Sequence, residues 1–165
     1  MRTYKIKDLV KFVVDNRGRN PSSVSELGLP IIDNFLINNN LYPDLLNVKR
    51  YLDIDYSKQF LRKPLLKDDL LITLVGNGYG NITLAPENCC IIQNTIGLRF
   101  NGICLQKYMY YKFLTMLTDF KGLNRGASQP SIKISDLLDL DIEIHEGDEQ
   151  QHIVNIISSL LLKFL

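Results

Sequence analysis

A continuous apolar run at residues 70–75, Leu-Leu-Ile-Thr-Leu-Val, is the feature that most limits what this chain can form. Charged residues precede the run and the glycine-rich residues 76–81 follow it, so turn-forming residues bound it on both sides. A short run of Leu, Ile and Val between turns is typical of a buried β-strand. The pattern recurs at residues 82–84, 89–92 and 96–100. The chain is therefore expected to build a sheet with tight turns.

Helical spacing of apolar residues appears in two places outside these strands. Residues 103–120 contain no Gly or Pro and predict a helix that Gly122 would cap. Residues 148–165 predict a final helix, and the alternating residues 140–144 predict a strand before it. In 165 residues, 45% of them apolar, this predicts one α+β domain: a twisted mixed or antiparallel sheet, flanking helices and a C-terminal helix.

The charged residues are distributed unevenly, although 19 Lys and Arg nearly balance 18 Asp and Glu. Residues 1–135 carry 18 of the basic side chains and 11 of the acidic ones, whereas residues 136–165 carry one basic and seven acidic. We therefore expect a basic face and an acidic face on different parts of the domain.

No run of about 20 apolar residues predicts a membrane span, and no apolar leader is recognisable. With three cysteines that form neither a CxxC pair nor a disulfide framework, a cytoplasmic protein with reduced core cysteines is expected.

Residues that carry chemistry are few. Gly76, Gly78 and Gly80 join two β-rich runs without the spacing of a dinucleotide or P-loop motif, and so predict a hairpin turn. The two histidines provide no triad or zinc site. Asp141 and Glu143 would lie on the same face of a strand. A solvent-exposed face explains these two acids more simply than a metal site does. No catalytic residue, metal site or cofactor is therefore expected.

Two basic, polar loops are candidates for contact with a nucleic acid, at residues 17–23 and 121–129. Cations there would contact phosphates or guanine edges, and short polar side chains would bond to bases. Ordinary surface loops are the alternative, since Arg and Asn are common in turns. Including the glycine-rich turn, the candidate DNA-binding residues are Arg17, Arg19, Asn20, Ser22, Asn77, Tyr79, Lys121, Asn124, Arg125, Ser128 and Gln129.

The last predicted helix carries an apolar seam too wide for a helix exposed to water. Its members, Ile153, Ile157, Leu160 and Phe164, follow 4-3-4 spacing. The seam could pack on its own domain or on another helix in a coiled coil, and two heptads do not decide between them.

Several segments, taken in order, form a pattern that spans nearly the whole chain: residues 5–10, 18–21, 66–73, 76–80, 92–94, 126–132 and 137–144, and Glu149-Gln150 with Ile153. In this pattern the chain resembles the target-recognition domain of the DNA specificity subunit of Type I restriction-modification systems. The prolines that the family usually has just before its Glu-Gln motif are replaced here by residues 145–148.

The resemblance implies a non-catalytic domain that binds double-stranded DNA sequence-specifically. It implies partner methyltransferase and restriction subunits, on which S-adenosylmethionine, ATP and magnesium would be bound. Residues 1–147 would form the recognition domain, and residues 148–165 would begin the family's spacer helix, which pairs with a second copy or a second recognition domain. This resembles a half-subunit or an isolated domain.

Two other functions remain open from the residues alone. The first is a small metal-dependent nuclease that uses Asp141 and Glu143. The second is a protein-interaction module whose C-terminal helix docks on a partner without DNA.

Overall fold

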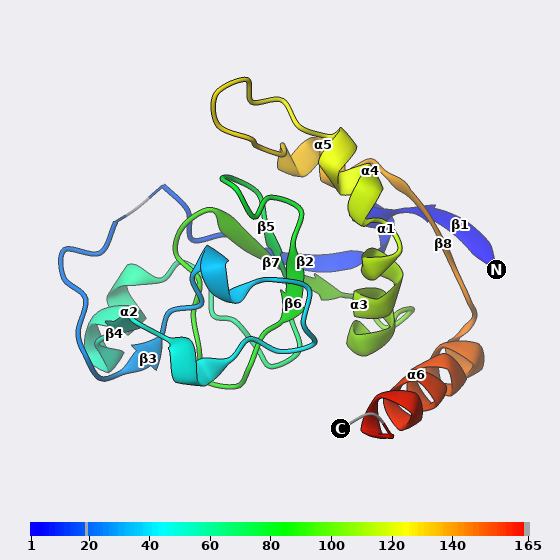
Figure 1. Cartoon of the computed structure of the whole chain (residues 1–165), viewed down its shortest axis with the longest axis horizontal. Coiled ribbons are helices and arrows are strands. Elements are labelled where there is room, and N and C mark those ends of the chain that lie inside the picture. Colours follow the sequence, from blue (N-terminus) through cyan, green and yellow to red (C-terminus); the bar gives the residue numbers. More distant parts are fainter. Residues whose placement is uncertain (19, 164–165) are drawn as a thin grey trace.

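The computed structural model describes residues 1–18 and 20–163 (Figure 1). The elements in chain order are β1 (Arg2–Lys5), α1 (Ile6–Leu9), β2 (Val10–Val14), β3 (Leu29–Pro30), the 3-10 helices η1 (Asn34–Leu36) and η2 (Leu45–Asn47), β4 (Tyr51–Leu52), α2 (Ile54–Phe60), β5 (Leu70–Thr73), β6 (Ile82–Leu84), β7 (Thr95–Phe100), α3 (Gln106–Leu114), α4 (Leu117–Gly122), α5 (Ile134–Leu138), β8 (Asp141–Ile144) and α6 (Gly147–Leu162). The expected α+β class is confirmed.

The central sheet has four strands in the order β2-β7-β5-β6, and every neighbouring pair is antiparallel. Two smaller antiparallel ribbons, β1-β8 and β3-β4, lie outside it. Strand β5 is buried at every position, as its unbroken apolar sequence predicts. In β8 buried and exposed residues alternate, as the sequence pattern predicts for a strand with one wet face.

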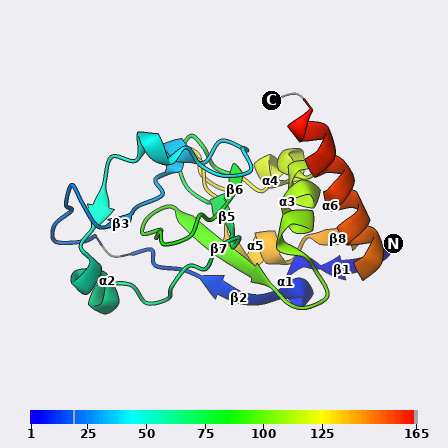
Figure 2. The ribbon, with the colours of Figure 1, turned by 90° about the horizontal axis from the view of Figure 1, so that it is seen from below.

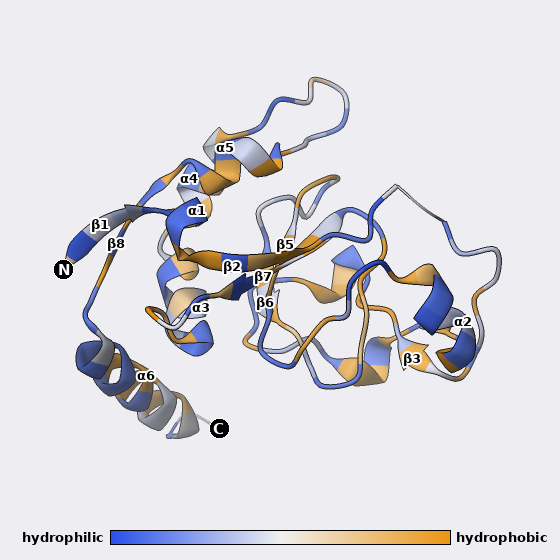
Figure 3. Cartoon of the chain, turned by 180° about the vertical axis from the view of Figure 1, so that it is seen from behind, coloured by the Kyte–Doolittle hydropathy of each residue, from blue (hydrophilic) through white to orange (hydrophobic). Residues whose placement is uncertain are grey.

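Helix α3 packs against β5 and β6, and α6 lies beside α3 (Figure 2). The aromatic rings of Phe113 and Phe120 meet between α3 and α4 with centroids 5.1 Å apart, and Phe100 from β7 approaches Phe113 edge-on. In Figure 3 the apolar colour gathers on the central strands, while α6 is mixed. The largest core cluster thus sits between the sheet and α3, and a second cluster that includes Val14, Ile32 and Leu71 lies on the other face of the sheet.

The strand expected at residues 89–92 is wrong. Cys90 makes a single parallel bridge with Ile31, through hydrogen bonds with the backbone of Pro30 and Ile32. These residues form a buried loop that fills the space between β3 and the central sheet. Burial, rather than strand pairing, explains why the segment is apolar.

The helix expected over residues 103–120 is divided into α3 and α4. Thr115 ends α3, and its hydroxyl donates to the carbonyl of Lys112 at 2.7 Å. Such a bond competes with helix continuation, and the break directs both Phe113 and Phe120 into the core. Gly122 is the last residue of α4 rather than its cap, which is Leu123. After α4, Ser131 bridges Val75 and α5 follows.

All three cysteines are free and buried. Burial raises the pKa of Cys89 and of Cys90 to about 12 and that of Cys104 to about 11. They are therefore neutral thiols near pH 7, as expected of core residues.

No helix among the described residues has the length and apolar character that crossing a membrane would require.

A buried ion pair fixes the start of β5 to the centre of the sheet. Asp69 is 1% exposed and accepts two hydrogen bonds from Arg99 in β7, at 2.9 and 2.7 Å. The backbone N–H of Leu66 donates a third at 2.8 Å. Because the carboxylate is enclosed and fully bonded, its removal would leave the guanidinium without its partner.

Replacing Asp69 with Ala should therefore lower the free energy of unfolding by roughly 2 to 3 kcal/mol, measured by urea denaturation. Lys58→Ala is the control, because Lys58 pairs with Asp55 on the surface of α2 and should contribute less than about 0.5 kcal/mol. Equal effects of the two substitutions would contradict a structural role for the buried pair.

Candidate nucleic-acid interface

Antiparallel pairing brings four chain segments to one edge of the central sheet. The end of β2, the start of β7, the end of β5 and the start of β6 all lie there. We call this the loop edge. It consists of residues 17–18 and 20–23 after β2, residues 76–80 between β5 and β6, residues 93–94 before β7, and residues 124–131, which adjoin the end of β5.

Hydrogen bonds connect these segments to one another. Asn20 accepts from the side chain of Gln93, and the carbonyl of Asn94 accepts from the backbone of Leu74 at 2.6 Å. The N–H of Gly76 then donates to the carbonyl of Pro130 at 2.9 Å. Both loops that the sequence indicates therefore belong to one continuous surface. In Figure 1 the yellow loop before α5 projects beyond the sheet at this edge.

A buried asparagine anchors the loop that follows β2. Asn16 is 3% exposed, and its Nδ2 donates to the carbonyls of Lys63 and Ile91 at 3.1 and 3.2 Å. Its Oδ1 accepts from the backbone N–H groups of Arg62 and Lys63 at 2.9 and 3.1 Å. All the hydrogen-bonding capacity of this amide is used, which holds the base of residues 17–23 against two other chain segments.

The predicted residues of this loop make internal contacts. The guanidinium of Arg17 makes two bonds of 2.9 Å with Asp15, and these bonds hold the pKa of Asp15 below its usual value. Ser22 bonds through its N–H and hydroxyl to the hydroxyl of Tyr56 at 3.2 and 3.3 Å. Arg19 lies outside the described residues. Arg17 thus already has a carboxylate partner, and Ser22 is fastened to Tyr56 of α2.

The turn at residues 76–80 is built together with Lys121. The ammonium group of Lys121 donates to the carbonyl of Tyr79 and lies 4.1 Å from the centre of its ring. Burial lowers the pKa of this lysine. Asn77 is exposed at the turn, and its side chain makes no hydrogen bond with the described residues. Gly76 and Gly80 have φ of +93° and +78°, a backbone conformation that favours glycine. The shape of the turn therefore accounts for these two glycines, and no nucleotide site is needed to explain them.

Residues 124–131 form a closed loop. Asn124 accepts hydrogen bonds within it, and Arg125 forms an ion pair of 2.6 Å with Asp136 of α5. Ser128 and Gln129 are exposed at its tip. The side chain of Arg125 is 61% exposed, whereas that of Asp136 is 21% exposed, so the guanidinium stays accessible to a phosphate while it is paired.

Sequence reasoning missed two residues of the loop edge, Gln93 and Asn94, and one residue beside it, Arg62. Gln93 and Asn94 form the turn before β7, with Asn94 at φ +58°. Arg62 donates to the carbonyl of Arg17 at 3.3 Å and has no carboxylate partner among the described residues. The sequence offers one indication of Gln93 and Asn94. They form a polar dipeptide between two apolar segments, which is typical of a turn, and turns between strands lie at the ends of a sheet.

The expected separation of charge needs correction. The N-terminal basic residues Arg2, Lys5 and Lys7 do not lie on the loop edge. They form ion pairs with the acidic segment 139–146, at 3.1, 2.7 and 2.7 Å; the acidic partners are Glu146, Asp141 and Asp139. The β1-β8 ribbon brings them together. The charges of the basic N-terminal segment and of the acidic segment 139–146 therefore neutralise each other and do not form separate faces.

Helix α6 is attached to the domain by a second buried amide. Gln150 is 1% exposed; its Oε1 accepts from the N–H of Leu105 at 2.9 Å. Its Nε2 donates to the carbonyls of Ile103 and His145 at 2.9 and 2.8 Å. The hydroxyl of Tyr108 bonds to both the backbone N–H and the ring Nδ1 of His145, at 3.0 and 2.7 Å.

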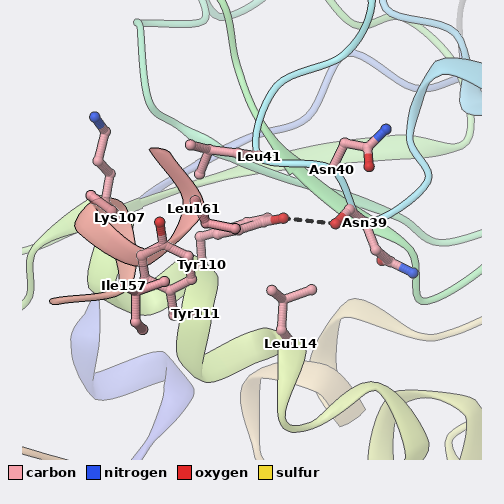
Figure 4. A pocket seen from close by; sticks show the side chains of 10 residues that line it. Asn39, Asn40, Leu41, Lys107, Tyr110, Tyr111, Leu114, Ile157 and Leu161 are labelled. Carbon is pink, nitrogen blue, oxygen red and sulfur yellow. Dashed lines mark hydrogen bonds between the residues drawn. The ribbon is translucent and has the colours of Figure 1, made fainter. Parts of the chain in front are cut away.

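The predicted apolar seam of α6 is only partly exposed. Ile153 packs on the core, and Ile157 lines a cavity of about 740 Å³ between α3, α6 and residues 39–41, which lie between η1 and η2 (Figure 4). In that cavity the hydroxyl of Tyr110 donates to the carbonyl of Asn39 at 2.7 Å. Leu160 is 50% exposed, and Phe164 lies outside the described residues. The boundary between residues 147 and 148 stays a prediction.

The family model for the Type I restriction modification DNA specificity domain matches residues 1–164. The chain belongs to this family. Type I specificity domains are the non-catalytic, DNA-recognising components of restriction-modification systems. No curated protein matches the chain significantly.

Solved structures have the same fold. A Type I system S subunit from M. genitalium superposes with a TM-score of 0.69 at 18% identity, covering 96% of this chain and 38% of that one. The HsdS subunit from Thermoanaerobacter tengcongensis superposes with a TM-score of 0.70 at 17% identity, covering 98% of this chain and 37% of that one. A chain solved in a study of complex assembly and conformational transition of the type I R-M system superposes with a TM-score of 0.73 at 17% identity, covering 98% of this chain and 38% of that one. This specificity domain thus spans less than two fifths of each matched chain.

Replacing Asn16 with Ala should lower the free energy of unfolding by roughly 2 to 3 kcal/mol, because buried backbone groups of three residues lose their partner. The loop should also open locally, so trypsin should cleave after Arg17 faster than in the parent. Asn47→Ala is the control, because Asn47 bonds only to Asp44 on the surface. Unchanged proteolysis of the Asn16 variant would show that this amide does not hold the loop.

Proposed function

We propose that this specificity domain binds duplex DNA sequence-specifically through the loop edge. The observation that carries the proposal is the joining of two separate polar loops into one surface, through Gln93, Asn94 and the Gly76–Pro130 bond. Such a surface offers the donors and acceptors that base edges in the major groove require. Arg62 and Arg125 supply cations for the phosphates on either side.

We further propose that the domain acts within a complex with methyltransferase and restriction subunits, in the cytoplasm. S-adenosylmethionine, ATP and magnesium would then be bound by those partners. The apolar residues Ile156, Leu160 and Leu161 are about half exposed on α6. Exposed apolar side chains at helical spacing favour contact with another helix, which supports α6 as the partner-binding element, whether that partner is a second copy or a second recognition domain.

The nuclease alternative has little support from the side chains. Asp141 is paired with Lys5 on the exposed face of β8, and Glu143 is exposed on the same face. Within the part of the chain that the structure describes, no group of three or more His, Cys, Asp or Glu side chains could hold a metal ion. The interaction-module alternative differs from our proposal in one measurable property, namely binding to DNA.

Arg125→Ala should weaken binding to a duplex selected from a random library by about fivefold to tenfold, measured by fluorescence anisotropy. The slope of log K against log salt concentration should become shallower by about one, because one phosphate contact is lost. Arg2→Ala is the matched control: Arg2 is also an exposed arginine paired with an acid, 71% exposed beside Glu146, but it lies on the β1-β8 ribbon.

Comparison of the two arginine variants distinguishes DNA binding at the loop edge from a general attraction of DNA to any exposed arginine. Equal weakening by both would contradict the assignment of the surface. If the parent protein selects no sequence from the library and shows no salt-dependent binding, the DNA-binding proposal itself fails, and the interaction-module alternative is favoured.

A further inference from the structure

The loop at residues 124–131 is closed across its base by one side chain. Asn124 Oδ1 accepts from the N–H groups of Gly126 and Ser131, both at 3.0 Å. The backbone N–H of Arg125 donates to the carbonyl of Ser131 at 2.9 Å. The Nδ2 group of Asn124 makes no hydrogen bond with the described residues. The contribution of this amide to the loop therefore comes from its oxygen alone.

A close approach of two backbone segments makes Gly126 necessary. A Cβ atom at this position would lie 1.7 Å from the carbonyl oxygen of Gln129 and 2.7 Å from its carbonyl carbon. These are backbone atoms that cannot rotate away. Glycine allows the chain to turn back on itself here because it has no side chain. Any other residue would force residues 126–129 to open.

The closed loop is fastened to the sheet on one side and to α5 on the other. Ser131 bridges Val75 beyond the end of β5, and the N–H of Ile132 donates to the carbonyl of Leu74 at 2.8 Å. Arg125 is held by Asp136. The loop base is thus positioned by elements of the core, which restricts its freedom before any ligand arrives.

The side chains at the tip of this loop are free to bond elsewhere. Ser128 and Gln129 are exposed, and their side chains make no hydrogen bond with the described residues. A glutamine side chain can bond bidentately to an adenine edge. We propose that Asn124 and Gly126 are positioning residues that hold Ser128 and Gln129 in a preformed reading geometry, an inference that rests on the proposed binding of duplex DNA.

This proposal changes the role predicted for Asn124. An asparagine that reads adenine needs both its Nδ2 donor and its Oδ1 acceptor. An asparagine that closes the loop needs only an acceptor, which aspartate also provides. Asn124→Asp therefore separates the two roles: it retains a positioning function and removes a base-reading one. Its added negative charge would weaken binding to all duplexes alike.

The test compares dissociation constants for a library-selected duplex and a scrambled duplex of equal length. The ratio used is the dissociation constant for the scrambled duplex divided by that for the selected duplex. Gly126→Ala and Asn124→Ala should each lower this ratio about tenfold, since the reading side chains lose their fixed geometry. Asn124→Asp should keep that ratio within about twofold of the parent. Gly102→Ala is the glycine control, because a Cβ there meets no atom within 4 Å, and it should leave the ratio unchanged.

Hydrogen exchange of the Gly126 and Ser131 amides gives a second measurement that does not depend on DNA. Both amides should exchange slowly in the parent and in Asn124→Asp, and fast in Asn124→Ala, with circular dichroism confirming that each variant is folded. A parent-like ratio for Gly126→Ala, or an Asn124→Asp variant as poor as Asn124→Ala, would overturn the positioning role. If the parent binds no duplex selectively, the DNA proposal fails, and the exchange rates alone decide whether Asn124 closes the loop.

Discussion

Antiparallel pairing of β7 with both β2 and β5 is the constraint on which the rest of this structure depends. It places the segments after β2, before β7 and after β5 at the same edge, although they are separated by up to about eighty residues in the chain. Gly97 leaves room for neighbouring side chains over β7, because a Cβ there would lie 2.8 Å from a methyl group of Leu65 and 3.3 Å from the Cβ of Val14 in β2. Arg99 of the same strand then binds Asp69. The polar surface is thus a consequence of how the apolar strands pair.

The sequence predicts well the elements that depend on local pattern. The strands around residues 70–75, 82–84 and 96–100, the alternating β8 and the helix α6 follow directly from hydropathy and period. The failures occur where a long-range contact decides. Residues 89–92 are apolar because a loop is buried, and the break between α3 and α4 depends on where the two phenylalanines must pack. Neither is visible in a local pattern.

The candidate site shows the same division. Composition identifies both polar loops, since Arg, Asn and Gly are frequent there. It does not reveal that Arg17 and Arg125 already have carboxylate partners, one of them eleven residues further along the chain. Nor does it reveal that the basic N-terminal residues pair with the acidic segment before α6. Charge sums describe a chain, whereas the field at a surface depends on which charges the fold has brought together.

The attachment of α6 through Gln150 has a geometric consequence. The bonds of this amide lie within the first turn of the 16-residue helix, which continues for 12 residues beyond Gln150, or about 18 Å. The buried contacts of the helix, those of Gln150, Ile153 and Val154, lie in its first two turns. The rest of the helix therefore acts as a lever arm: a tilt of about 10° at Gln150 would move the far end by about 3 Å over that length. Small adjustments among Tyr108, His145 and Gln150 are therefore amplified with distance, and the direction of α6 is determined by a few hydrogen bonds inside the domain.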